Sequence, residues 1–184
     1  MRIISGKYKG QLVSFQAGHI RPTTDRVKES LFNILGGTCE GLTVLDLFSG
    51  TGSLGFEALS RGAVSCHFVE SNRKSIDIIR RNQDKLKIQE PVQITSKDVL
   101  SFVRNYKGQP FDLIFIDPPF TEEMADEVMQ AVSGVSALFS PQTVLSIESG
   151  RREKIGQDYG ALLRYDQREF GDKFLSFFRW EQAE

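Results

Sequence analysis

The segment Asp117-Pro118-Pro119-Phe120 follows an apolar run over residues 111–116, so a carboxylate comes directly before two prolines. An apolar run of this length is typical of a buried strand, and Asp117 would then lie where the strand ends. Each proline fixes its own φ and restricts the residue before it, which orients the Pro118 carbonyl in advance. This arrangement could serve an enzyme, although a structural turn is the simpler interpretation.

The chemistry that suits this segment is attack by a weakly nucleophilic amine. The exocyclic amine of a nucleobase is a poor nucleophile because its lone pair is delocalised into the ring. The Asp117 carboxylate and the Pro118 carbonyl could accept hydrogen bonds from the two amine hydrogens, and Phe120 could stack on the planar group. A base must be unpaired or swung out of its helix to enter such a site. The predicted catalytic residues are Asp117, Pro118, Pro119 and Phe120.

A glycine-rich segment over residues 48–55 contains G-x-G-x-x-G between a second apolar run and a helical pattern. Glycines allow a sharp turn and a close approach to a ligand, and the start of a helix offers N–H groups. Nicotinamide enzymes share this motif, and Glu70 would then bind the ribose hydroxyls.

Asp46 separates the two cofactors that this turn could hold. A carboxylate beside the turn would repel the pyrophosphate of a dinucleotide, but it would attract the sulfonium and ammonium of S-adenosylmethionine. Asp98, which follows the next apolar run, could accept a hydrogen bond from the adenine amino group. Any one of these acids could instead be a helix cap or a turn residue. The predicted cofactor-binding residues are Asp46, Phe48, Ser49, Gly50, Gly52, Glu70, Ser71, Asp98 and Val99, and no metal site is predicted.

Apolar runs and helical patterns alternate along the chain. Strands are predicted over residues 43–48, 65–70, 92–95, 111–117 and 143–148, with helical patterns between them. This alternation predicts an α/β fold, a doubly wound, mostly parallel, seven-stranded Rossmann-like sheet with ligands at the carboxyl ends of the strands. Residues 162–180 predict an antiparallel C-terminal hairpin, and residues 2–15 a small N-terminal β-hairpin. We expect one domain over residues 1–184, with an N-terminal extension over 1–40 and a cofactor-binding core over 41–184.

Composition and charge narrow the class of protein. Charged residues make up 26% of the chain, and no stretch approaches the roughly 18 apolar residues of a membrane span. No signal peptide is recognisable at the start, so a cytoplasmic location is expected. The two cysteines, Cys39 and Cys66, form neither a disulfide framework nor a metal motif. His67 is expected to be a packed strand residue rather than a base.

The first 28 residues carry six basic residues and one acid, although the whole chain has a net charge of −1. Such asymmetry favours a polyanion on one face, against the simpler interpretation of a solvated surface strip. Asp25 or Thr24 could cap a helix with an apolar stripe of Val27, Leu31, Ile34 and Leu35. That helix could cover the cofactor. The residues predicted to bind this polyanion are Arg2, Lys7, Lys9, Arg21 and Arg26.

These motifs together resemble a known family. The Asp117-Pro118-Pro119-Phe120 segment, the glycine turn with Asp46, and the Arg-Pro-containing segment over residues 21–35 are similar to the RsmD family of bacterial small-subunit rRNA guanine-N2 methyltransferases. The resemblance spans residues 2–180. It implies a methyltransferase sheet, S-adenosylmethionine as cofactor, and methylation of one guanine of 16S rRNA in the 30S ribosomal subunit. Ser49 stands where this family more often has alanine, and Lys173 where it more often has a small or hydroxyl residue.

Several alternatives stay open. Only the resemblance selects guanine, because Asp117 could equally accept hydrogen bonds from the N6 amine of adenine in RNA or DNA. Methylation of a protein glutamine would favour Asn rather than Asp at the start of the catalytic segment. A catalytically silent RNA-binding assembly factor would keep the basic front without the carboxylates. A monomer is expected.

Overall fold

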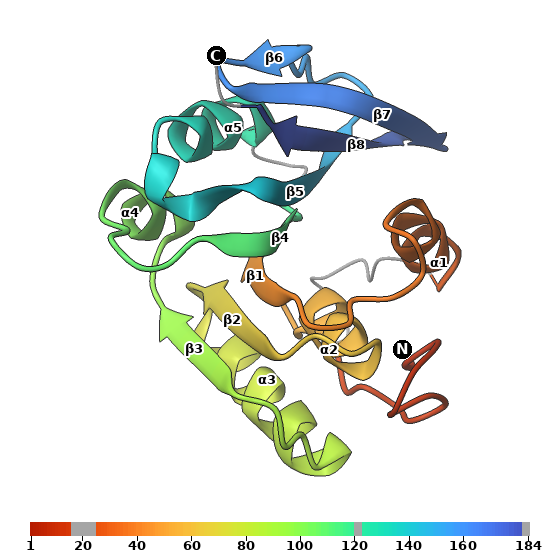
Figure 1. The fold of residues 1–184 in the computed structure, drawn as a ribbon. Coiled ribbons are helices and arrows are strands. Elements are labelled where there is room, and N and C mark those ends of the chain that lie inside the picture. Colours follow the sequence, from red (N-terminus) through yellow and green to blue (C-terminus); the bar gives the residue numbers. More distant parts are fainter. Residues whose placement is uncertain (16–24, 120–122, 182–184) are drawn as a thin grey trace.

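The computed structural model describes residues 1–15, 25–119 and 123–181, and within them an eight-stranded sheet forms the centre of the molecule (Figure 1). The strand order is β3-β2-β1-β4-β5-β8-β7-β6. The first five strands pair in parallel, and β5, β8, β7 and β6 pair antiparallel. The strands are β1 (Thr43–Leu47), β2 (Ser65–Glu70), β3 (Val92–Ser96), β4 (Phe111–Ile116), β5 (Phe139–Gly150), β6 (Asp158–Tyr159), β7 (Leu162–Phe170) and β8 (Lys173–Trp180).

The fold class predicted from the sequence is therefore confirmed. The predicted parallel strands and C-terminal hairpin are present, and the two-residue strand β6 is an addition that is too short to give a sequence signal. Strand β5 is longer than predicted at both ends, because it begins at Phe139, opposite Phe111 of β4, and runs on to Gly150, beside the start of β8. Gly171, in the turn between β7 and β8, has a φ of +64°, a conformation that glycine adopts without strain.

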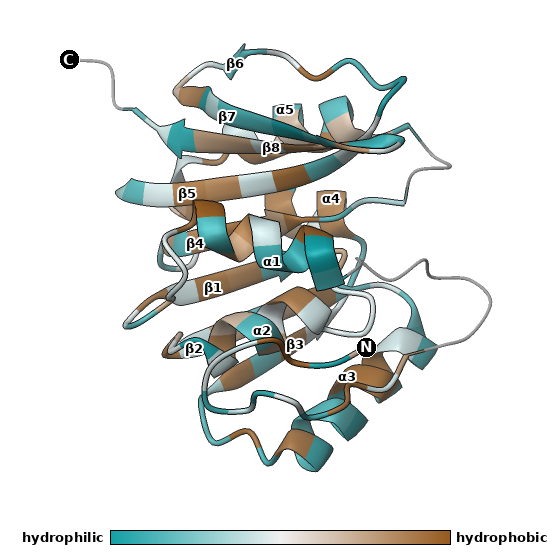
Figure 2. Cartoon of the chain, turned by 90° about the vertical axis from the view of Figure 1, so that its right-hand side faces the viewer, coloured by the Kyte–Doolittle hydropathy of each residue, from teal (hydrophilic) through white to brown (hydrophobic). Residues whose placement is uncertain are grey.

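Helices cover both faces of the sheet. They are α1 (Asp25–Ile34), α2 (Ser53–Ser60), α3 (Arg73–Leu86), α4 (Val99–Arg104) and α5 (Ala125–Ser133), and a short 3-10 helix, η2 (Ser136–Leu138), precedes β5. The apolar residues of α1, α2 and α3 pack on one face, and those of α4 and α5 on the other. Figure 2 shows α1 and α2 in front of the strands. We call these the α2 face and the α5 face.

Alternation along the strands explains why both faces are apolar. In β4, Leu113 and Phe115 pack on the α2 face, whereas Ile114 and Ile116 pack on the α5 face. A parallel strand that is buried on both faces therefore has a continuous apolar sequence, and such runs were the basis for predicting these strands. No helix in the described part of the chain is long and apolar enough to cross a membrane.

The N-terminal segment is more weakly strand-like than the predicted hairpin. A single antiparallel bridge joins Arg2 to Leu12, and backbone hydrogen bonds on either side extend the pairing. Ile3, Tyr8 and Val13 are buried in the same apolar cluster as β1 and α2. The segment is thus fixed by packing on the α2 face.

Helix α1 differs in detail from the predicted stripe. Val27 and Leu31 are buried as expected, while Ile34 and Leu35 pack only partly against the cluster. The other fully buried side chains are Phe32 and, unexpectedly, Lys28. The predicted cap Thr24 lies outside the described residues, and Asp25 begins the helix.

Candidate functional site

The turn between β1 and α2 has the conformation that the glycines predicted. Phe48, Gly50 and Gly52 have φ values of 58°, 53° and 80°. A β-carbon at Gly52 would come within 2.6 Å of the Phe56 ring, so both its backbone and its surroundings exclude a side chain. Ser49 Oγ fastens the turn by donating to the carbonyl of Asp46 at 2.6 Å. The result is a rigid turn whose N–H groups lie at the start of a helix.

Asp46 is a buried acid directly before this turn. Its Oδ2 accepts a hydrogen bond from the N–H of Gly55 at 3.0 Å, and the residue is 2% exposed. Burial raises the pKa of Asp46 to about 7, the Gly55 hydrogen bond opposes this rise, and the negative charge of Glu70 adds to it. A cationic ligand beside Asp46 would favour the ionised carboxylate.

Glu70, at the end of β2, ties the turn to the neighbouring strand. Its Oε2 accepts from the N–H of Gly50 and its Oε1 accepts from the N–H of Asn72, both at 2.8 Å. The predicted role of Glu70 was to bind ribose, and these contacts hold its carboxylate beside the glycine turn. Ser71, the next residue, is exposed.

Asp98, after β3, is the N-cap of helix α4. Its Oδ1 accepts from the N–H of Ser101 at 2.8 Å, and the residue is exposed. Val99, which follows it, is buried on the α5 face. The cap role that the sequence left open is therefore real, and it fixes the Asp98 carboxylate at the same edge of the sheet as Asp46 and Glu70.

The candidate catalytic segment lies next to the glycine turn. Ile116 at the end of β4 pairs with Leu47 at the end of β1, and the N–H of Asp117 donates to the Leu47 carbonyl at 3.4 Å. Asp117 therefore lies beside Phe48. Pro118 is buried and Pro119 is exposed, while Phe120 lies outside the described residues. The fold thus brings the glycine turn and the catalytic segment together, although they are about 70 residues apart in the sequence. Parallel strands can be neighbours only through a long crossover connection.

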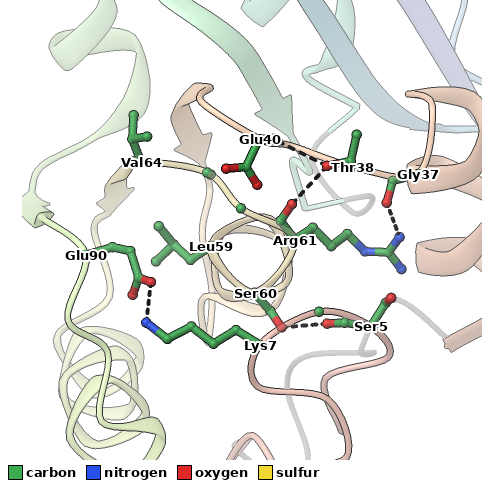
Figure 3. Close-up of a pocket in the computed structure, with 13 residues that line it drawn as sticks. Ser5, Lys7, Gly37, Thr38, Glu40, Leu59, Ser60, Arg61, Val64 and Glu90 are labelled. Carbon is green, nitrogen blue, oxygen red and sulfur yellow. Dashed lines mark hydrogen bonds and ion pairs between the residues drawn. The ribbon is translucent and has the colours of Figure 1, made fainter.

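The basic residues predicted to bind RNA divide between two places. Arg2 pairs with Asp25 at 3.4 Å, near the start of α1, where Arg26 also lies. Lys7 instead pairs with Glu90 at 2.8 Å (Figure 3), next to Ser60 at the far end of α2. The exposed Lys9 follows in the same turn. Arg21 lies outside the described residues.

Two of the cavities on the described surface lie away from Asp46 and Asp117. One, of about 720 Å³, lies at the amino edge of the sheet between Lys7, Thr38, Arg61 and Glu90 (Figure 3). The other, of about 670 Å³, lies between α1 and β7. The carboxyl edge of the sheet remains the better candidate site because the buried Asp46, three further acids, the N–H groups of a helix and the glycine turn converge there.

Two buried charge clusters gave no clear signal in the sequence. Lys28 and Arg61 both pair with Glu57 beneath the N-terminal segment. Lys173 pairs with Glu148 at the end of β5. Glu57 and Arg61 are four residues apart at the end of α2, but the contacts of Lys28 with Glu57 and of Lys173 with Glu148 join different elements and do not follow from local periodicity.

His67 and the two cysteines are packed inside the fold. Burial lowers the pKa of His67 to about 4, and its Nε2 lies 2.8 Å from Thr95 Oγ1. Both cysteines are buried and unbridged. No group of three or more metal-binding side chains is found among the described residues.

Comparison with known proteins identifies what the chain resembles. The family model described as conserved hypothetical protein 95 matches residues 1–179. A Haemophilus influenzae protein named ribosomal RNA small subunit methyltransferase D is 36% identical over 81% of this chain and 78% of its own length. The Escherichia coli protein of the same name is 32% identical over 81% of this chain and 74% of its own length.

Solved structures agree with these sequences. The Escherichia coli protein yhhF superposes with a TM-score of 0.87 at 28% identity, covering 98% of both chains. Haemophilus influenzae HI0767 superposes with a TM-score of 0.82 at 28% identity, again covering 98% of both chains.

Proposed function

Because the chain belongs to the RsmD family, we propose that it methylates rRNA of the small ribosomal subunit, with S-adenosylmethionine as methyl donor and N2 of one guanine in 16S rRNA as acceptor. The Haemophilus influenzae and Escherichia coli relatives are named as methyltransferases of small-subunit rRNA, and these names supply the substrate class. The proposal includes a cytoplasmic, monomeric enzyme that acts on the 30S subunit and needs no metal.

Asp46 is the observation that carries the choice of cofactor. It is an acid with a pKa of about 7 beside a glycine turn, and that turn would otherwise suit a phosphate. S-adenosylmethionine supplies an electrophilic methyl group on a cationic sulfonium and also carries an ammonium, so it fits an acidic turn. Glu70 and Ser71 would face its ribose, and Asp98 and Val99 its adenine. Phe48, Ser49, Gly50 and Gly52 would enclose its methionine part.

The acceptor amine would be held by the catalytic segment. Asp117 and the Pro118 carbonyl accept hydrogen bonds from the N2 hydrogens, which draws the nitrogen lone pair out of the ring. The guanine N2 then attacks the methyl carbon, the carbon–sulfur bond breaks, and its electron pair leaves with sulfur in S-adenosylhomocysteine. The methylated nitrogen then loses a proton, which Asp117 or solvent takes up. Phe120 would stack on the base, and Arg2, Arg21 and Arg26 would contact RNA near this edge.

The direct test supplies methyl-labelled S-adenosylmethionine with unmethylated small subunits, naked rRNA and duplex DNA in parallel. Separating the digested nucleosides should show label in N2-methylguanosine, from subunits. Label in N6-methyladenine would assign the enzyme to adenine. Tight cofactor binding with no label in any nucleic acid would rule out the proposed substrate.

Asp117→Ala tests the mechanism separately. We expect it to abolish transfer while RNA binding persists. An unchanged rate of transfer would contradict the catalytic role of Asp117.

A further inference from the structure

Glu148 lies on the strand next to the catalytic segment, at the same level. Strand β4 pairs in parallel with β5, with Ile116 opposite Ile147. The next residues are Asp117, directly after the end of β4, and Glu148 of β5. Neighbouring strands are about 4.8 Å apart, so the sheet places a second carboxylate beside the one that would hold the amine.

Both carboxylates belong to the same face of the sheet. Glu148 pairs with Leu175 of β8, and Leu175 packs on the α2 face. Ile147 and Ile116 pack on the α5 face, so the residues that follow them alternate to the α2 face. Asp46 also lies there, since it is in register with Phe68 and Phe115 of that face. The three acids thus line one side of the carboxyl edge.

Lys173 holds Glu148 in place from the adjacent strand. Its Nζ donates to Oε1 of Glu148, and their side chains are 12% and 6% exposed. No buried side-chain polar atom of the described residues lacks a hydrogen-bond partner. Among the described residues only Oε1 of Glu148 has a side-chain partner, so Oε2 is not completely buried and is left to accept a hydrogen bond. A buried ion pair adds little net stability. We therefore take the main effect of the Lys173–Glu148 pair to be that it fixes the orientation of the Glu148 carboxylate.

Guanine and adenine differ on the edge that such an oxygen would meet. Guanine presents N1–H beside its 2-amine, so it offers a row of donors. Adenine presents a bare N1 lone pair beside its 6-amine, and a carboxylate would repel that lone pair. A base swung out of its helix is read by hydrogen bonds to this Watson–Crick edge. Two adjacent carboxylates therefore match guanine and mismatch adenine.

We propose that Glu148 selects guanine, with Oε2 accepting the N1–H of the target base while Asp117 accepts an N2 hydrogen. Lys173 is a positioning residue that fixes the Glu148 carboxylate and offsets the charge of the acid pair. This inference rests on the proposed guanine-N2 function, and it supplies the choice of base that the catalytic segment alone does not make.

The test varies the base and the protein together. Small subunits are reconstituted with guanine or 2-aminopurine at the target position, since 2-aminopurine keeps the 2-amine but has a lone pair at N1. The native enzyme should show a kcat/KM at least about tenfold lower on 2-aminopurine, as expected for loss of one base-edge contact. In Glu148→Gln, the side-chain N–H can donate to that N1. The guanine rate should then fall about tenfold, and the preference for guanine should shrink or reverse.

Two further variants keep the result interpretable. Glu148→Gln removes the negative charge beside Lys173, so the double variant Glu148→Gln with Lys173→Met removes both charges of the pair and should show the same loss of preference. Glu169→Gln, an exposed acid of β7 paired with Arg151, is the matched control and should keep the native preference. The cofactor Kd should be unchanged in all of them, which separates base selection from misfolding.

The outcomes separate the two proposals. Native guanine preference in both Glu148 variants, with N2-methylguanosine still formed, overturns the role of Glu148 and leaves the proposed function standing. Failure of the native enzyme to label guanine in any substrate overturns the proposed function, and the role of Glu148 with it.

Discussion

Two fully buried acids on the α2 face, Asp46 and Glu57, have opposite surroundings. Glu57 accepts from Lys28 at 3.3 Å, from Arg61 at 2.9 Å, and from the N–H groups of Ile4 and Ser5. Asp46 accepts from one backbone N–H, and no ion pair of the described residues includes it. Burial alone therefore does not mark a functional acid. A buried acid that lacks a protein cation is the one prepared to receive a cationic ligand.

The largest expected effect is at Glu57. Glu57→Ala leaves Lys28 and Arg61 buried without their shared anion and frees two backbone donors of the N-terminal segment. We expect the free energy of unfolding to fall by roughly 3–5 kcal/mol, measured by urea denaturation. Asp77→Ala, which breaks the exposed Asp77–Arg80 pair, should change it by no more than about 0.5 kcal/mol. Equal effects of the two changes would contradict a structural role for the buried cluster.

At Asp46 the expected loss is in cofactor binding instead. Asp46→Asn keeps an oxygen for the Gly55 N–H but removes the charge, so S-adenosylmethionine should bind on the order of 100-fold more weakly. That factor corresponds to part of the roughly 4 kcal/mol between close charges near a protein surface. Isothermal titration measures it. Stability should be maintained or improved, because a carboxylate is no longer buried. A large drop in stability with an unchanged Kd for S-adenosylmethionine would show that Asp46 is a structural acid like Glu57, not a ligand-binding one.

The raised pKa of Asp46 predicts a pH dependence of cofactor binding. Below about pH 7 the free protein holds a proton on Asp46, and a cationic ligand must displace it. Affinity should therefore fall up to about tenfold per pH unit below pH 7 and level off above it, with a proton released on binding. Titration in buffers of different ionisation enthalpy detects that proton. The slope should vanish in Asp46→Asn, and a slope that persists there would assign the proton to another group.

The smallest expected effect concerns the two groups of basic residues. Arg26→Glu lies near the catalytic edge and should weaken binding to small subunits and lower its salt dependence. Lys7 lies at the amino edge of the sheet, where it pairs with Glu90. Lys7→Glu should therefore weaken binding to small subunits less than Arg26→Glu does. Filter binding at two salt concentrations compares the variants. A larger loss from Lys7→Glu would place the RNA across the amino edge.

Much of this site follows from sequence because parallel strands end at one edge. An apolar run with an acid at or just beyond its carboxyl end is a local pattern, and the fold class brings the ends that carry Asp46, Glu70, Asp98 and Asp117 to one edge. The glycine turn is equally local, since its φ values restrict the residue type at each position.

Contacts between elements distant in the chain were not predictable. Lys28 looked like part of a basic surface, yet it is fully buried because its Nζ reaches the Arg2 carbonyl at 2.7 Å and Glu57 of α2. Lys7 looked like an RNA contact, and its position depends on how the N-terminal segment packs against α2. Local charge counts cannot anticipate such pairings.

The sequence by itself determined the fold class, the turn that suits a nucleoside cofactor, and the carboxylate before two prolines, because periodicity and backbone restriction act over a few residues. Only the tertiary structure decided which charges are buried together, which edge each basic residue occupies, and that Glu148 lies beside Asp117 with Lys173 holding it. Strand register and cross-strand packing set these relations, and both are properties of the assembled sheet.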